Sequence, residues 1–350
     1  MNHRMRTAGI LAAVLVAGGL AACGSSAGNP ARASAGGSSS SKITIMVGGL
    51  DKQIYLPAQL TQSLGYFKQE GLDVDLQTEP AGVDAETAML AGHVDAVVGF
   101  YDHNIQLQAK GKTTESIVQF SQVPGEVELT ANTQSGVRSP ADWKGKNVGI
   151  TGAGSSTDFL SQYLAVKAGL NVSDIHRVAV KAGQTFIAAM QHGQIVSGMT
   201  TEPTITAAVD MGLAHVMTDM RTKAGTVAAL GGTYPAACLY APTSWVNGHK
   251  AVVQKLADAF VKTLQYIATH SGAEITDHVP ADFYKGVGKA KYAAALDAGK
   301  GMFTADGVMP SDGPQTVLSV LQLALPDVKN AKIDLAKTYT TEFAQAASAG

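Results

Sequence analysis

The stretch Trp143–Thr157, WKGKNVGITGAGSST, sets the architecture of this chain. A short β-rich run from Asn147 to Thr151 leads through two glycines into a helical segment, Thr157 to Ala168. The same alternation continues with a strand at 175–180, a helix at 186–192 and a strand at 195–200. Successive βαβ units predict a mainly parallel sheet with helices on its faces.

The first half of the chain has the same organisation. Strands are expected at 43–47, 72–76 and 94–98, with a helix at 85–91 between the last two. Two short motifs also recur. Gly71-Leu72-Asp73-Val74 returns as Gly169-Leu170-Asn171-Val172, and Met89-x-x-Gly92-x-Val94 returns as Met190-x-x-Gly193-x-Ile195. The recurrence predicts two related α/β lobes.

Beyond Tyr234 the pattern changes. A strand-like run, 234–240, leads into a mostly helical tail, which we expect to pack on the first lobe. The chain would then cross between lobes near 124–129 and near 231–233, where Gly and Pro are suited to a hinge. The predicted division is 42–127 plus 233–350 for lobe 1 and 128–232 for lobe 2. The helices of the tail are expected near 251–270, 291–302, 314–325 and 340–347.

The N-terminus has the order of segments found in an exported lipoprotein. Arg4 and Arg6 precede an apolar stretch that ends in Leu20-Ala21-Ala22-Cys23-Gly24, the pattern of a bacterial lipobox. We therefore predict a signal peptide at 1–22, lipidation of Cys23, and a flexible linker that completes the segment 23–41. The alternatives are an uncleaved anchor helix or an ordinary signal with a chance cysteine.

Composition narrows the function. The 350 residues hold 26 basic and 28 acidic side chains, for a net charge of −2, and no basic run indicates nucleic acid. Cys238 has no second cysteine for a disulfide once Cys23 is lipidated, and its neighbours favour a small buried hydrophobe. The nine histidines are scattered, and no Gly-x-Ser-x-Gly or His-Glu-x-x-His motif occurs. We expect no enzyme activity, no cofactor and no metal.

The loop after the strand at 147–151 is the best-defined candidate for binding. In open α/β sheets, ligands lie beyond the carboxyl ends of the strands. Gly154 would let a ligand approach the backbone, and free N–H groups at the helix start favour an anionic group. Ser155, Ser156 and Thr157 add hydroxyl donors. The alternative is that Ser156 or Thr157 only caps the helix. A dinucleotide fingerprint is disfavoured because Thr157 stands at the third glycine position.

Other loops at the same sheet edges supply further candidates. Gly49, Gln53 and Tyr55 follow the first strand, while Tyr101 and His103 follow the strand at 94–98. Asp102, between them, would orient a partner at the site or, as is more common, cap the helix that follows. In the second lobe, Thr201 and Glu202 would close the site, although Glu202 equally fits the start of the helix that Pro203 opens. Arg221 would neutralise an acidic ligand or, more commonly for such a residue, form a solvated salt bridge.

The order of several motifs carries a family resemblance. From Leu56 to Trp245 the chain resembles the solute-binding proteins of nitrate, sulfonate, taurine and thiamin-pyrimidine ABC importers. The resemblance rests on Gly65-Tyr66-Phe67 with Glu70-Gly71-Leu72-Asp73-Val74, Leu90-Ala91-Gly92-His93-Val94-Asp95-Ala96, Gly99-Phe100-Tyr101-Asp102-His103, Trp143 to Ile150, Gly152 to Thr157, and Glu202-Pro203. It implies a two-lobed periplasmic-binding-protein fold of type II, a Venus flytrap whose lobes are mostly parallel sheets flanked by helices.

The resemblance also implies a function. The protein would capture a small polar or anionic organic solute and deliver it to a membrane permease, acting as a monomer held to the cell membrane through Cys23, on the periplasmic or outer side. Sulfonate, nitrate, taurine, aromatic carboxylate and pyrimidine ligands all remain compatible with these loops. A ligand-sensing lipoprotein and an enzyme on the same fold are the rival functions. The Cys-rich active segment of the thiamin-pyrimidine synthases has no counterpart here.

Overall fold

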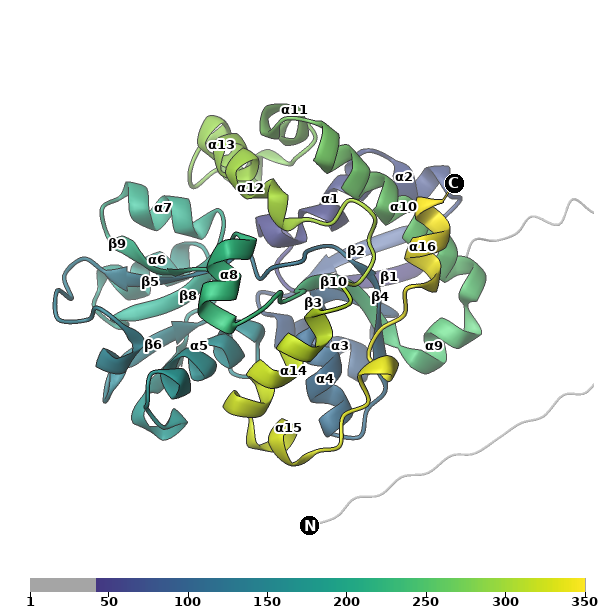
Figure 1. Ribbon diagram of the computed structural model, residues 1–350. Helices are drawn as coiled ribbons and strands as arrows, with labels where there is room; N and C mark the ends of the chain where they lie inside the picture. The colour runs from purple at the N-terminus through teal and green to yellow at the C-terminus, as the bar shows by residue number, and fades with distance from the viewer. Residues whose placement is uncertain (1–41, 350) are drawn as a thin grey trace, which may run out of the picture. The chain divides into compact units, whose positions relative to one another are not determined.

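Two five-stranded β-sheets organise residues 42–349, which are the residues that the computed structural model describes (Figure 1). The predicted signal peptide, Cys23 and the linker lie outside these residues. The ten strands are β1 (Ile43–Val47), β2 (Val74–Thr78), β3 (Ala96–Phe100), β4 (Thr114–Gln119), β5 (Glu126–Ala131), β6 (Asn147–Ile150), β7 (His176–Ala179), β8 (Ser197–Thr201), β9 (Ala214–Asp219) and β10 (Ala237–Pro242).

The two sheets have equivalent topologies. The first has the order β2-β1-β3-β10-β4 and the second β7-β6-β8-β5-β9. In the first sheet β1 pairs in parallel with β2 and β3, and β10 is antiparallel to both of its neighbours. The second sheet repeats this arrangement: β6 pairs in parallel with β7 and β8, and β5 is antiparallel to both β8 and β9. The predicted fold class, two lobes built on mostly parallel sheets, is confirmed.

Each lobe takes its antiparallel strand from the point where the chain crosses over. β5 follows β4 directly yet pairs in the second sheet, and β10 follows the second lobe yet pairs in the first sheet. The first crossing therefore lies just before Glu126, and the predicted crossing segment 124–129 is wrong in part, because its last four residues are already paired as strand. Because β5 and β10 each begin just after a crossing, the two lobes are linked at the places where the chain passes between the sheets.

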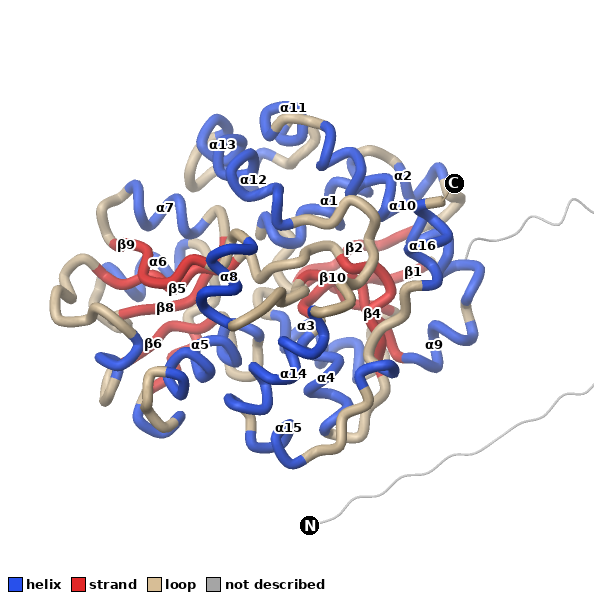
Figure 2. The backbone as a smooth tube through the Cα atoms, in the orientation of Figure 1, coloured by secondary structure: helices blue, strands red, loops and turns tan. Residues whose placement is uncertain are grey.

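Helices cover both faces of each sheet (Figures 1 and 2). On the first sheet, α1, α2, α10 and α16 pack together on one face, and α3, α4, α14 and α15 cover the other. On the second sheet, α5 and α8 lie opposite α6 and α7. The helices are α1 (Leu56–Ser63), α2 (Tyr66–Gln69), α3 (Gly82–Leu90), α4 (Asp102–Ala109), α5 (Ser156–Lys167), α6 (Gln184–Gln191), α7 (Thr204–Asp210), α8 (Lys223–Leu230), α9 (Thr243–Gly248), α10 (Lys250–Thr269), α11 (Gly272–Thr276), α12 (Ala281–Tyr284), α13 (Lys289–Gly299), α14 (Gly313–Ala324), α15 (Pro326–Asn330) and α16 (Glu342–Ser348).

The helical tail packs on the first sheet, as the sequence predicts. The 20-residue α10 contacts α1, α2 and β4, and α14 contacts α4. The α14 helix also packs against α5 of the second lobe, so the two lobes share an apolar cluster. A second, smaller cluster lies between the second sheet and α6 and α7.

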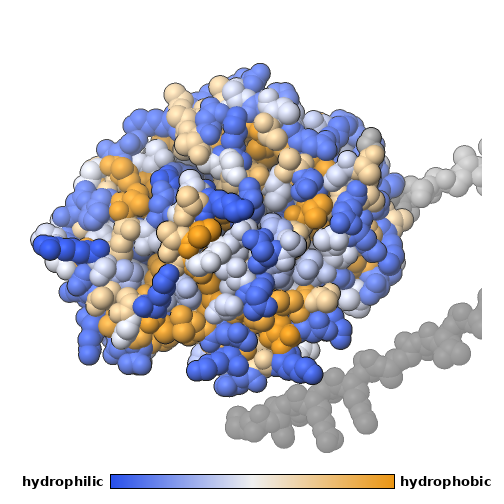
Figure 3. All heavy atoms as spheres, in the orientation of Figure 1, coloured by the Kyte–Doolittle hydropathy of each residue, from blue (hydrophilic) through white to orange (hydrophobic). Residues whose placement is uncertain are grey.

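Hydrophobic side chains on the face drawn in Figure 3 form several separate patches among hydrophilic ones. Among residues 42–349, no helix combines the length and apolarity that a membrane span requires.

Candidate ligand-binding cleft

A small polar cavity lies where the carboxyl ends of the parallel strands of both sheets meet. The loop after β1 contributes one wall, the loop between β6 and α5 another, and the end of β8 a third. This is the position at which open α/β sheets bind ligands. The lining residues are Lys52, Ile54, Tyr55, Gly82, Glu126, Thr151, Ser155, Ser156, Thr157 and Thr201.

This cavity is small, with a volume of about 20 Å³. A single water requires about 10–15 Å³ measured in the same way. A solute of several heavy atoms does not fit a cavity of this volume.

Five of the predicted binding residues line the cavity: Tyr55, Ser155, Ser156, Thr157 and Thr201. The sequence alone predicted that these residues follow the carboxyl ends of strands, which is where the cavity lies. The prediction missed Lys52 and Glu126, the two ionisable side chains of the lining other than Tyr55. Both had a signal in the sequence, because Lys52 lies in the predicted first loop and Glu126 follows Pro124-Gly125 in the predicted crossing.

Lys52 is buried, with 8% of its surface exposed, and its ammonium group is held by backbone oxygens. Its Nζ donates to Gly48 O at 2.6 Å and to Pro80 O at 3.1 Å. Burial lowers the pKa of Lys52 to about 8, with the carboxylates of Asp51 and Glu126 opposing the shift.

Gly49 makes room for this lysine instead of facing a ligand. Its φ of +116° belongs to the region that favours glycine, and a Cβ there would lie 2.4 Å from Lys52 Cε. Gly49 therefore acts on the site through the position of Lys52.

Glu126 is buried at the start of β5, with 5% of its surface exposed. Within residues 42–349, no group donates a hydrogen bond to its Oε2. Burial, reinforced by the charge of Asp102, raises the pKa of Glu126 well above its ordinary value, and Lys52 only partly opposes this.

The loop between β6 and α5 does not offer the free anion site that the sequence predicted. The Gly154 N–H donates to Asp158 Oδ2 at 2.8 Å, and Arg177 holds the same carboxylate with contacts of 2.8 and 2.9 Å. The Thr157 hydroxyl accepts from the Thr151 N–H at 3.0 Å. A carboxylate already lies in the first turn of α5, so the helix dipole is largely compensated there.

Ser156 instead joins the two lobes. Its hydroxyl, at the start of α5, donates to Asp102 Oδ1 at 2.8 Å, and the Tyr234 hydroxyl donates to Oδ2 of the same carboxylate at 2.9 Å. All three side chains are buried. Burial raises the pKa of Asp102, while its hydrogen-bond donors and His103 act in the opposite direction. Asp102 begins α4, so the expectation that it only caps this helix missed its contact with the second lobe.

Further hydrogen bonds join the two lobes beside the cavity. The Gln53 N–H donates to Glu202 O at 3.0 Å, across from the first lobe to the second. The side chain of Gln53 turns away from the cavity and donates to Tyr292 O at 3.0 Å. Ser155 Oγ lies 3.4 Å from the Val83 N–H, a long contact.

Tyr101 and His103 lie outside the cavity lining, contrary to prediction. The Tyr101 hydroxyl is hydrogen-bonded to Thr338, and its ring packs edge-on against Tyr339, both in the C-terminal segment. His103 lies behind Gly82, where a Cβ on that glycine would be 3.0 Å from Nε2.

The His103 ring belongs to a buried charge contact. Its Nδ1 lies 2.6 Å from Glu86 Oε2. Burial lowers the pKa of His103, but the adjacent Glu86 carboxylate outweighs burial and leaves the pKa raised. We assign both Tyr101 and His103 to the packing of lobe 1, since neither reaches the cavity.

Glu202 and Arg221 form a structural network beside the cleft. The Glu202 carboxylate accepts from the Thr206 N–H at 3.0 Å and from Arg221 Nη1 at 3.1 Å, so it serves the start of α7. Arg221 also pairs with Asp219 at 2.7 Å. Of the alternatives left open by the sequence, the helix-start role of Glu202 and the salt-bridge role of Arg221 agree with these contacts.

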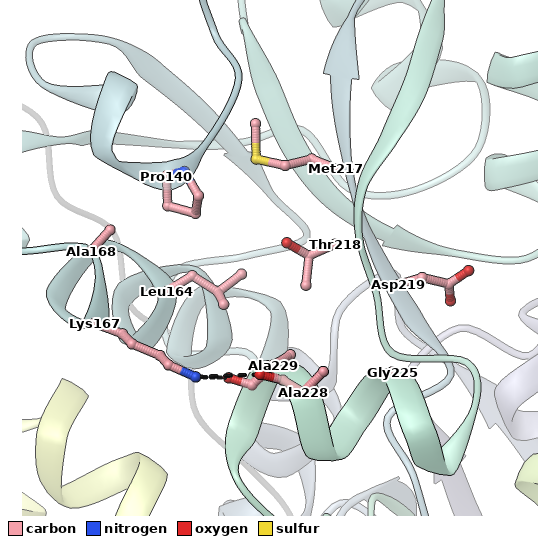
Figure 4. Close-up of a pocket in the computed structure, with 10 residues that line it drawn as sticks. All are labelled: Pro140, Leu164, Lys167, Ala168, Met217, Thr218, Asp219, Gly225, Ala228 and Ala229. Atoms are coloured by element: carbon pink, nitrogen blue, oxygen red, sulfur yellow. Dashed lines mark hydrogen bonds between the residues drawn. The ribbon is translucent and has the colours of Figure 1, made fainter.

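A larger groove of about 460 Å³ lies on the second lobe, away from the cavity (Figure 4). Leu164, Met217 and Ala229 give it an apolar surface, and Lys167 donates to Ala229 O at 2.6 Å across it. None of the predicted site residues lines this groove. It is shallow and open, so we place the candidate site in the small cavity between the lobes instead. Within residues 42–349, no group of three or more His, Cys, Asp or Glu side chains is arranged to hold a metal ion.

Curated relatives include proteins of two kinds. YtlA of Bacillus subtilis, provisionally named as a binding protein, is 23% identical over 65% of this chain and 67% of its own length. The 4-amino-5-hydroxymethyl-2-methylpyrimidine phosphate synthase of Schizosaccharomyces pombe is 29% identical over 47% of this chain and 46% of its own length. The match thus spans about half of the synthase.

Solved structures share the fold over most of both chains. A protein from Bordetella bronchiseptica RB50 has a TM-score of 0.85 and 34% identity, over 88% of this chain and 97% of its own. The periplasmic nitrate-binding protein of Synechocystis has a TM-score of 0.68 and 12% identity, over 89% of each chain. The alkanesulfonate-binding protein of Xanthomonas axonopodis has a TM-score of 0.64 and 18% identity, over 85% of this chain and 98% of its own.

A family model with the description NMT1/THI5 like matches residues 55–273, which include strands of both sheets and every residue of the cavity lining except Lys52 and Ile54. The chain belongs to the NMT1/THI5-like family.

Proposed function

We propose that this protein is the solute-binding subunit of an ABC importer, that it captures one small polar solute between its lobes, and that it performs no chemistry on it. The observation that carries the proposal is the small cavity between the sheets, to which loops of both sheets contribute polar side chains. A trap of this kind must open to admit a solute and close to retain it. The nitrate- and alkanesulfonate-binding proteins that share the fold support the same function.

The proposed moving units follow the predicted division, except that the first boundary moves from 127 to 125 because β5 pairs in the second sheet. Lobe 1 is then 42–125 with 233–350, and lobe 2 is 126–232. Each connection between the sheets contains a glycine with positive φ, Gly125 in the first and Gly231 in the second. Small rotations at these two connections would separate the loops that line the cavity, because both connections lie at the same edge.

The proposed membrane anchor is the lipid on Cys23, with the rest of segment 23–41 as a tether. Tethering keeps the binding protein near its permease. The expected result is that an acyl label enters the wild type and is lost in Cys23→Ala. Equal labelling of both would contradict the anchor and leave solute binding untouched.

Solute binding is tested by thermal unfolding of protein that has been unfolded and refolded to remove retained solute. The panel contains nitrate, an alkanesulfonate, taurine, an aromatic carboxylate and an aminopyrimidine. A ligand at 100 times its Kd stabilises the folded state by about 2.7 kcal/mol, so a true solute raises the midpoint measurably.

Two matched variants locate the site. Thr201→Val removes a hydroxyl that lines the cavity and donates to Gly125 O at 3.2 Å, and it should weaken binding about 2- to 10-fold, the cost of one hydrogen bond. Thr218→Val makes the same change in the groove of Figure 4 and should leave binding unchanged. The opposite pattern would move the site to that groove. Turnover of a bound solute would support an enzyme, and stabilisation by a protein partner but by no solute would support a sensor.

A further inference from the structure

Two buried ionisable side chains face the cavity from different sheets. Lys52 lies in the loop after β1 of the first sheet, and Glu126 begins β5 of the second sheet. Each exposes less than a tenth of its surface, at 8% and 5%. Charged side chains are rarely buried to this degree unless each has a partner of its own.

The two side chains do not serve as partners for one another. Within the described residues, no ion pair joins the Lys52 ammonium to the Glu126 carboxylate, although both line the same cavity. Lys52 uses two of its three N–H donors on Gly48 O and Pro80 O, which leaves one donor. Within residues 42–349, no group donates a hydrogen bond to Glu126 Oε2.

A buried carboxylate without a donor destabilises the folded protein, because the group loses its hydration and gains no hydrogen bond in return. A ligand that presents an N–H group to Glu126 removes this cost. A ligand that presents an acid or another strong acceptor to Lys52 satisfies its remaining donor. A solute that offers only one of these groups leaves the other side chain unsatisfied.

On the basis of the proposed function, we propose that the solute is amphoteric, with an amine or other N–H-bearing nitrogen bound by Glu126 and an acidic or strongly accepting group bound by Lys52. Nitrate and simple alkanesulfonates offer acceptors alone, so they fit only the Lys52 side of the cavity. The cavity thus selects for a solute with two different polar ends.

Binding of such a solute also changes the protonation of the site. Burial raises the pKa of Glu126 and lowers that of Lys52 to about 8. An N–H cation beside Glu126 would lower the pKa of its carboxyl, and an anion beside Lys52 would raise the pKa of its ammonium group. The amphoteric solute therefore reconstitutes two ion pairs within one closed cavity.

The test uses refolded wild-type protein and three matched series of probes. Each series has an amphoteric member, the same skeleton without its amino group, and the same skeleton without its acid: 2-aminoethanesulfonate with ethanesulfonate and ethylamine, 4-aminobenzoate with benzoate and aniline, and 4-aminopyrimidine-5-carboxylate with pyrimidine-5-carboxylate and 4-aminopyrimidine. Affinities are measured by calorimetry. In parallel, a metabolite extract is passed over the immobilised protein, and the retained solute is identified by mass spectrometry.

Three variants assign the roles. Wild-type protein should bind the amino-bearing solute at least 10-fold more tightly than its amine-free analogue. Glu126→Gln should abolish this preference. Lys52→Met should abolish the corresponding preference for the acid-bearing solute over its acid-free analogue. Glu128→Gln is the matched control, because Glu128 is a buried carboxyl on the same strand that does not line the cavity, and it should leave both preferences unchanged. Unfolding midpoints of the unliganded variants confirm that each folds.

The outcomes separate this inference from the proposed function. An amphoteric solute that binds more tightly than both analogues, with its nitrogen preference lost in Glu126→Gln, supports the inference. Equal binding of an analogue, an unchanged preference in Glu126→Gln, or a retained solute without either group overturns it while solute binding stands. Failure of every probe together with an extract that yields no solute overturns the proposed function, and the inference with it.

Discussion

Loss of the Ser156 hydroxyl should shift the lobes toward the open form. This hydroxyl donates to Asp102 Oδ1 at 2.8 Å, from the second lobe to the first, and both side chains are buried. The bond exists only when the lobes are closed, because opening separates α5 from α4. Ser156→Ala therefore acts on the closed form and leaves the folded state of each lobe intact.

The magnitude follows from the type of bond. A hydrogen bond to a charged group contributes about 1.5–3 kcal/mol. At about 1.4 kcal/mol for each factor of ten, its removal should lower the ratio of closed to open molecules about 10- to 100-fold. Tyr234 continues to hold the other oxygen of Asp102, so the carboxylate keeps one donor.

The assay is the distance between one spin label on each lobe of the unliganded protein. Lys112→Cys and Lys144→Cys place labels at exposed positions, while the buried Cys238 does not react and Cys23 is replaced by Ala. Ser155→Ala is the matched control, because its contact with the Val83 N–H is 3.4 Å long and should contribute far less. Equal distance distributions for wild type, Ser156→Ala and Ser155→Ala would refute the reasoning.

Two further predictions concern the buried ionisable groups. Burial raises the pKa of Glu128 from 4.5 to about 8, with the Ser197 hydroxyl only partly opposing it. The folded protein therefore keeps a proton that the unfolded chain releases, and wild-type stability falls by about 1.4 kcal/mol per pH unit between these values. Measured by chemical denaturation, the free energy of unfolding of Glu128→Gln should rise by about 3 kcal/mol relative to that of the wild type between pH 5.5 and 7.5. Parallel pH profiles of unfolding free energy for the two proteins would contradict this. Gly49→Ala should displace Lys52, because the added Cβ would lie 2.4 Å from its Cε, and the positive φ adds about 1 kcal/mol of strain or more. Denaturation and solute calorimetry should then both show losses; unchanged affinity would mean that Lys52 does not bind the solute.

The strands and helices of this protein were largely predictable from the sequence, because their signals are local. The strand at 43–47 was predicted at the bounds of β1, and the helix at 157–168 differs from α5 by one residue at each end. The repeated motifs also predicted two equivalent lobes, because each lobe repeats the same order of elements. From that order alone, Tyr55, Ser155 and Thr201 could be placed at the carboxyl ends of parallel strands, where the cavity lies.

The direction of individual side chains was decided only by tertiary structure. Tyr101 follows β3 at the expected edge, yet its hydroxyl reaches Thr338, 237 residues further along the chain. Gly154 was expected to offer a free N–H, but Asp158 takes it because Arg177, from β7, holds that carboxylate in place. A loop position follows from strand order, whereas a side chain's partner depends on which distant segment packs beside it. The placement of Lys52 and Glu126 around one cavity arises in this way, since the two residues belong to separate sheets.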